Sequence, residues 1–216
     1  ATEQSPQGML SLFQLLAKKS LASLENAHPY LLSHPMPLER IRNLELEAKK
    51  SAFFNKDDAP QLLLRHHLMQ AKLAGFMQSP QYVFQRYPSA DKSLPARYAR
   101  SISMFRKGDT KNAIPIIDSL IRDIPENPYF WELKGQALLE GGAPAKALAS
   151  LRQANKLLPN SGLIQILYAQ ALIATEDRAN IKQALNLLTL AKKTERDSVD
   201  VYKYSALAYG YLNDLP

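Results

Sequence analysis

A spacing of 34 residues recurs in the second half of the chain and restricts its possible folds more than any other feature. In residues 128–161 the spacing is carried by Trp131, Gly135, Leu138, Ala147, Leu151, Ala154 and Pro159. In residues 94–127 the equivalent positions hold Ser101, Met104, Ala113, Ile117, Leu120 and Pro125. Small side chains at a fixed interval let two antiparallel helices approach closely, and units that bury only one face must stack on their neighbours. The spacing therefore predicts an all-α fold built from stacked helical hairpins.

These positions resemble those of the tetratricopeptide repeat, in which each unit is one helical hairpin and the hairpins form a right-handed superhelix. The resemblance divides the second half into repeats at 94–127, 128–161 and 162–198, followed by the first helix of a fourth repeat at 199–216. The third repeat is longer than the others by three residues, and we place these in its inter-helix turn, around residues 176–181.

The second repeat gives the most specific expectations about packing. Gly135 and Ala147 should face each other across the hairpin, because only small side chains let the two helices come close. Trp131 should then lie in the core beside them. Lys134 departs from the pattern, since leucine is usual at that position.

The first helix of each tetratricopeptide repeat lines a concave inner groove, and the resemblance therefore implies a set of groove residues. These residues are Tyr98, Ile102, Phe105, Arg106, Tyr129, Glu132, Gln136, Leu139, Leu163, Ile166, Gln170, Ile173, Lys203, Leu207 and Tyr211. A contiguous apolar surface that bears tyrosines and a few charges is typical of protein- or peptide-binding sites. The alternative is that another helix of the same polypeptide fills the groove.

The N-terminal part is also predicted to be helical. Residues 1–52 hold two helices, which begin at Ser5-Pro6 and at Pro37, because serine caps helices and proline is favoured in their first turn. Two further helices in residues 53–93 should link these to the repeats and cap them.

The segment from Gly8 to Ile41 carries a second resemblance. A helix rich in leucine and phenylalanine leads to Ser33-His34-Pro35, and Arg40-Ile41 follow after four residues. This order resembles the C-terminal end of the peptidase domain in bacterial zinc metallopeptidases of the BepA and HtpX kind. In BepA-like members a tetratricopeptide domain follows, as it does here.

The resemblance implies a periplasmic, membrane-associated zinc endopeptidase that degrades misassembled outer-membrane proteins. The repeats would recruit clients or assembly partners, or contact the peptidase domain itself. His34 would be a regulatory fourth zinc ligand and Arg40 an anchor for its loop; alternatively, His34 caps the helix that begins at Pro37 or packs in the loop. We place residues 1–52 at the end of such a peptidase domain.

The catalytic zinc site itself would require a His-Glu-x-x-His helix and a downstream glutamate. The chain has four histidines, and no two of them are spaced by four residues: His28, His34, His66 and His67. We therefore expect no catalysis and no cofactor in this fragment, and zinc in the parent protein. A free-standing tetratricopeptide adaptor without protease activity is the alternative.

Composition narrows the remaining function classes. The net charge of +7 would suit a nucleic-acid binder, but acidic residues are interleaved and no run of five like charges occurs. We therefore expect no nucleic-acid partner. No stretch is apolar for the roughly 20 residues that a membrane-spanning helix needs. The chain begins without a methionine or signal segment, so we expect a piece of a longer protein, in the cell envelope by resemblance.

Overall fold

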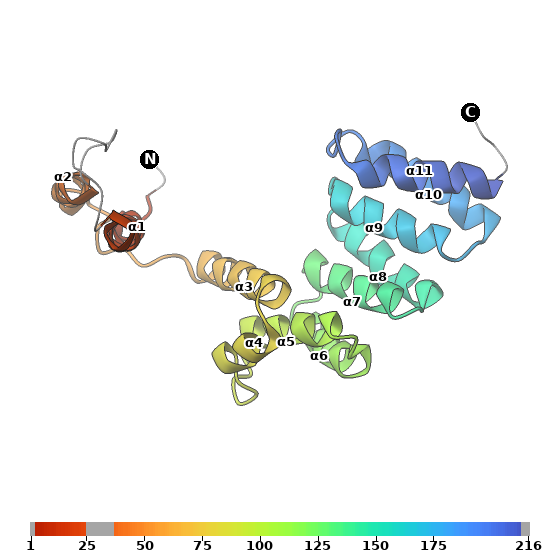
Figure 1. The fold of residues 1–216 in the computed structure, drawn as a ribbon, viewed down its shortest axis with the longest axis horizontal. Helices are drawn as coiled ribbons and strands as arrows, with labels where there is room; N and C mark the ends of the chain where they lie inside the picture. Colours follow the sequence, from red (N-terminus) through yellow and green to blue (C-terminus); the bar gives the residue numbers. More distant parts are fainter. Residues whose placement is uncertain (1–2, 25–36, 213–216) are drawn as a thin grey trace. The chain divides into compact units, whose positions relative to one another are not determined.

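The structure is a computed structural model, and it describes the backbone of residues 3–24 and 37–212 and the side chains of residues 3–18 and 41–212 (Figure 1). Every regular element within these ranges is a helix, which confirms the all-α prediction. The chain divides into two compact units, Ala1–Arg65 and His66–Pro216, and each is described by itself.

The first unit contains a pair of helices, α1 (Gln7–Leu24) and α2 (Pro37–Lys49). They pack against each other, and their buried side chains are Leu10, Ala17, Ile41 and Ala48. The Ser5 hydroxyl donates a hydrogen bond of 2.6 Å to the Phe54 carbonyl, which ties the start of α1 to the segment after α2.

The second unit is a succession of helical hairpins that follows two other helices. Those are α3 (Pro60–Met77), which enters the unit at His66, and α4 (Pro80–Arg86). The hairpins pair α5 (Leu94–Arg106) with α6 (Thr110–Asp123), α7 (Pro128–Glu140) with α8 (Pro144–Leu157), and α9 (Gly162–Ile173) with α10 (Arg178–Ala191). The last described helix is α11 (Val199–Leu212).

Local sequence signals explain where these helices begin and end. Ser93, Asp109, Asn127, Ser161 and Asp177 each accept a backbone N–H hydrogen bond at the start of the helix that follows. Such side chains satisfy N–H groups that have no partner within the helix. After α5 and α7, Gly108 and Gly142 adopt φ angles of +80° and +77°, which only glycine adopts without strain.

The three hairpins keep the same register. The second helix begins sixteen residues after the start of its repeat in each case, at Thr110, Pro144 and Arg178. The extra residues of the third repeat therefore do not lie around residues 176–181, and that prediction is wrong. They lie between α10 and α11, where the connection spans residues 192–198 and is longer than those at 124–127 and 158–161.

Packing inside the second hairpin follows the small-residue principle. A Cβ atom added to Gly135 would lie 2.4 Å from Leu151 Cγ on α8, so Leu151 lies directly against the glycine. Ala147 is fully buried on the same helix, and its facing of Gly135 stays a prediction. Phe130 is the fully buried aromatic residue here. Trp131 is half-buried instead of filling the core; its indole N–H donates a hydrogen bond of 2.7 Å to the Pro125 carbonyl.

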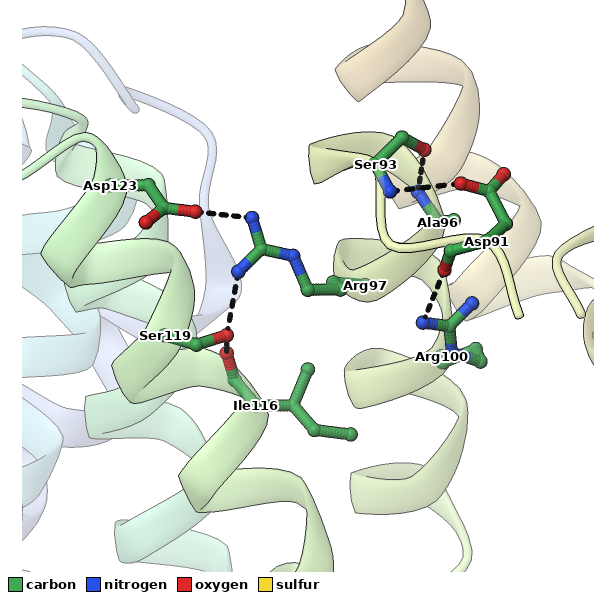
Figure 2. Close-up of polar contacts among 8 residues, drawn as sticks. All are labelled: Asp91, Ser93, Ala96, Arg97, Arg100, Ile116, Ser119 and Asp123. Carbon is green, nitrogen blue, oxygen red and sulfur yellow. Dashed lines mark hydrogen bonds and ion pairs between the residues drawn. The ribbon is translucent and has the colours of Figure 1, made fainter. Parts of the chain in front are cut away.

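Polar contacts hold the first hairpin and the segment before it in place (Figure 2). Arg97 on α5 reaches Ser119 and Asp123 on α6. The buried guanidinium of Arg100 donates hydrogen bonds to the backbone carbonyls of Tyr87, Pro88 and Asp91. Arg100 therefore fixes the turn between α4 and α5 to the body of α5.

A candidate protein-binding surface

Three of the four groove residues predicted on the first repeat are buried in the structure, and the fourth, Arg106, is exposed. Tyr98, Ile102 and Phe105 on α5 have exposed fractions of 2%, 0% and 5%. Their burial differs from the open groove that the sequence suggested. The side chains pack in one cluster with residues of α3, α6 and α7, among them Ala71, Ile117 and Phe130.

The helix α3 crosses α5 at a glycine. A Cβ atom added to Gly75 would lie 2.8 Å from Ile102 Cβ and 3.0 Å from the Ala99 carbonyl oxygen. A guanidinium nitrogen of Arg106 donates a hydrogen bond of 3.4 Å to the Gly75 carbonyl. These contacts show that α3 lies on the face of α5 that was predicted to line the groove.

A lysine on α3 also reaches the second repeat. Lys72 Nζ lies 3.0 Å from Glu132 Oε2 and 5.0 Å from the centre of the Tyr129 ring, both on α7. A cation held between a carboxylate and an aromatic face combines an ion pair with a cation–π contact. Four predicted groove residues thus contact α3: Ile102, Arg106, Tyr129 and Glu132.

The remaining predicted groove residues fall into three groups by exposure. Ile166 and Ile173 are buried in the core between the hairpins, while Gln136, Leu139 and Gln170 are half-buried. The exposed side chains are Leu163, Lys203, Leu207 and Tyr211, together with the outer part of Tyr129. Leu207 and Tyr211 are each 45% exposed, and the Tyr211 hydroxyl lies 3.5 Å from Glu176 Oε1. The inner face is therefore covered by α3 at repeat one and carries exposed side chains on repeats two and three and on α11.

Burial raises the pKa of one tyrosine on α5, Tyr98. The pKa of Tyr98 is raised well above its ordinary value of 10, chiefly because burial disfavours the phenolate and secondarily because Glu132 and Tyr129 lie near. Among the residues that the structure describes, the Tyr98 hydroxyl has no hydrogen-bond partner. A buried hydroxyl without a partner costs about 1–3 kcal/mol relative to a paired one.

Comparisons with known proteins agree with this fold. No protein-family model matches the chain, and no curated protein matches its sequence. Solved structures do match it. The structure "MamA MSR-1 C2" has a TM-score of 0.56 and 15% identity, with 73% of this chain and 89% of that chain covered. The structure "MamA AMB-1 P212121" has a TM-score of 0.54 and 16% identity, with coverage of 73% and 85%.

MamA is a tetratricopeptide-type helical repeat protein, and the chain has the same type of fold. This confirms the fold class that the 34-residue spacing predicted. The likeness to MamA does not bear on the resemblance to BepA-type peptidases, which stays a prediction.

The roles of His34 and Arg40 that the peptidase resemblance implies stay predictions. His34 lies outside the described residues, and Arg40 lies on α2 where its side chain is not described. In the described part of the chain, no three histidine, aspartate or glutamate side chains gather in a way that could hold a metal ion. None of the described helices combines the length and the apolar character of a membrane span.

Sequence reasoning missed the residues that α3 contributes to this surface, Lys72 and Gly75. A signal was present, because Ala71, Ala74 and Gly75 form a face of small residues on an otherwise leucine-rich helix. Such a face indicates close approach by a neighbouring helix. The sequence does not say which helix that neighbour is.

Proposed function

We propose that this chain is a protein-interaction scaffold whose inner face, formed by the first helices of the repeats, binds segments of other proteins. One observation carries the proposal: the helix α3 already packs on Ile102 of repeat one and is paired with Glu132 of repeat two. The surface therefore has the shape and chemistry to take a helix. The same face continues over α7, α9 and α11.

The exposed part of this face has the composition of a binding surface. Tyrosine and leucine side chains supply large contact areas, and tyrosine adds a polar end. On this face Tyr129, Leu163, Leu207 and Tyr211 are at least 45% exposed. Apolar side chains gathered on one face of a folded protein commonly mark an interaction site.

A photo-crosslinking experiment tests the position of the site. A benzophenone amino acid is introduced at Leu207 or Tyr211 on the inner face, and at Asn186 on α10 as a matched exposed control. We expect captured proteins to be shared by positions 207 and 211 and absent at 186. Capture that is equally strong at all three positions would count against an inner-face site.

An affinity measurement then tests the chemistry with the identified partner. Leu207→Glu places a charge on the exposed apolar part and should weaken binding by at least about tenfold, equivalent to about 1.4 kcal/mol. Asn186→Glu adds the same charge on α10 and should leave the affinity unchanged. Tyr98→Ala and Phe105→Ala are poor tests, because both side chains are buried and their loss would disturb folding.

We further propose that the scaffold belongs to a BepA-like periplasmic zinc metalloendopeptidase and recruits its clients or assembly partners. The order of the His34-to-Ile41 segment and the repeats supports this. The parent reading frame should then encode a His-Glu-x-x-His segment upstream. A reading frame without it would favour the free-standing adaptor.

A further inference from the structure

An unpaired polar group, the Tyr98 hydroxyl, lies near two residues that α3 contacts. Tyr98 is 2% exposed, and its buried hydroxyl has no hydrogen-bond partner within the described ranges. It lies near Glu132 and Tyr129, the two residues that hold Lys72. Buried hydroxyls in folded proteins are almost always paired, so α3 leaves this part of the inner face incompletely satisfied.

The contacts of α3 with the repeats are those of a docked helix. The polar ones are the Lys72–Glu132 ion pair at 3.0 Å and the longer Arg106–Gly75 hydrogen bond at 3.4 Å. The close approach depends on one residue without a side chain, Gly75. A helix held in this way can be replaced by another helix that offers the same few features.

The other face of α3 is apolar and exposed. Met69, Leu73 and Met77 lie opposite the small-residue face and are at least half exposed. A helix that is apolar on both faces is normally buried on both. Here the face toward the repeats is covered, while these three side chains are exposed.

We propose that α3 is a ligand in cis, which competes for the inner face with a partner helix that carries a glycine or alanine crossing point and a lysine or arginine in the place of Lys72. The proposal rests on the proposed function and specifies its partner. Glu132 and the Tyr129 ring recognise the cation, and the Ile102 side chain selects for a small residue at the crossing. An acceptor on the partner would pair the Tyr98 hydroxyl, which α3 leaves unpaired.

Cis competition has a measurable consequence. A tethered helix acts at an effective concentration in the millimolar range, so it excludes a weaker partner until it is loosened. Gly75→Leu loosens it, because even a Cβ at this position would lie 2.8 Å from Ile102 Cβ and 3.0 Å from a backbone oxygen. Gly210→Leu is the matched control, since nothing lies within 4 Å of a Cβ at Gly210 on α11.

The probe is a fluorescein-labelled synthetic peptide with the sequence of residues 60–77, added to the full chain. We expect the Gly75→Leu protein to bind the peptide at least about tenfold more tightly than the wild type or the Gly210→Leu protein does. Fluorescence anisotropy gives the affinities. Circular dichroism and hydrogen exchange over α5–α11 verify that the repeats remain folded.

A charge exchange tests the recognition of the cation. The peptide with Lys72→Glu should bind the Gly75→Leu protein at least about tenfold more weakly, and the additional protein substitution Glu132→Lys should restore that binding. If Gly75→Leu disturbs the fold, Lys72→Glu in the full chain loosens α3 without steric overlap and takes its place. Non-specific adhesion of the peptide would not recover when both charges are reversed, so recovery would identify the contact between residues 72 and 132.

Three outcomes would overturn the proposal. They are equal peptide affinity for the wild-type and Gly75→Leu proteins, no peptide binding by a loosened variant with folded repeats, and binding that ignores the reversed charges. In each case photo-crosslinking at Leu207 and Tyr211 would still report on the scaffold function separately. Crosslinks at these two positions, together with no effect of loosening α3, would support the scaffold function and exclude competition by α3.

Discussion

Gly135 on α7 faces Leu151 on α8 so closely that a Cβ atom on the glycine would lie 2.4 Å from Leu151 Cγ. Leu151 is fully buried and cannot move outward without opening the hairpin. The pair therefore sets the distance between the two helices of the second repeat. It also explains why the 34-residue pattern requires a small residue at this position.

Gly135→Ala should destabilise the protein by about 1–3 kcal/mol, because overpacking forces side chains and backbone to shift. The control is Gly210→Ala on α11, where nothing lies within 4 Å of the new Cβ. That substitution should stabilise by up to about 1 kcal/mol through helix propensity. Urea denaturation followed by circular dichroism measures both, and equal effects of the two substitutions would contradict the packing described.

Arg100→Ala should cost about 2–4 kcal/mol, because it leaves the carbonyls of Tyr87, Pro88 and Asp91 without their charged donor. Arg100→Lys should recover only part of this loss, since an ammonium group cannot reproduce the planar fork of donors. Hydrogen exchange should show increased opening of residues 87–93 in both variants. Full recovery by lysine would mean that charge alone matters here.

Lys134 Nζ lies 2.6 Å from Asp118 Oδ1 on α6, and this contact gives the unusual lysine a role between repeats. Because both side chains are partly exposed, the pair should contribute only about 0–1 kcal/mol. Lys134→Leu should therefore change the free energy of unfolding by less than about 1 kcal/mol. A double-mutant cycle with Asp118→Asn measures the coupling, and a coupling near 3 kcal/mol would indicate a far more desolvated pair.

Tyr98→Phe should keep or increase stability at neutral pH, because it removes a buried hydroxyl that has no partner among the described residues. The pKa of Tyr98 is raised in the folded state. The part of the free energy of unfolding that depends on the neutral Tyr98 phenol is therefore fully present below the unfolded-state pKa near 10. It is lost as the pH rises above that pKa. Urea denaturation from pH 8 to 11 should show a weaker alkaline loss for Tyr98→Phe than for Tyr209→Phe, whose ring is exposed.

The helices of the repeats could be predicted from sequence because their signals are local. Capping residues such as Ser93 and Asp109 mark the starts, and the recurring small and apolar residues mark the buried faces. Phe130 shows the limit of this reasoning. A shift of one position turns a side chain by about 100° around a helix. The pattern places Trp131 in the core, but here Phe130 is the fully buried ring and packs against Tyr98.

The placement of the extra residues failed for a similar reason. Ala184, Leu188 and Ala191 fit the repeat pattern when it is shifted by three, and all three are buried. However, Ile181 and Leu187 are buried as well, so α10 covers a wider face and begins without any shift. A pattern built on a few positions cannot distinguish a displaced helix from one that is buried more broadly.

The position of α3 could not be predicted because it depends on a crossing between distant segments. Its small-residue face predicts a close neighbour, and many apolar helix faces in the chain could supply one. The pairing with α5 is decided by the fit of Gly75 over Ile102 and by the reach of Lys72 to Glu132. These are properties of the assembled surface.

The connection between α10 and α11 limits how the array could be lengthened by design. A Cβ at Gly162 would lie 2.3 Å from Thr194 Oγ1 and 2.4 Å from Glu195 Cγ, so this connection rests directly on the first residue of α9. An engineer who inserts a consensus repeat after α10 would remove that brace along with the longer linker. A working extension would have to carry residues 192–198 and Gly162 together as one module.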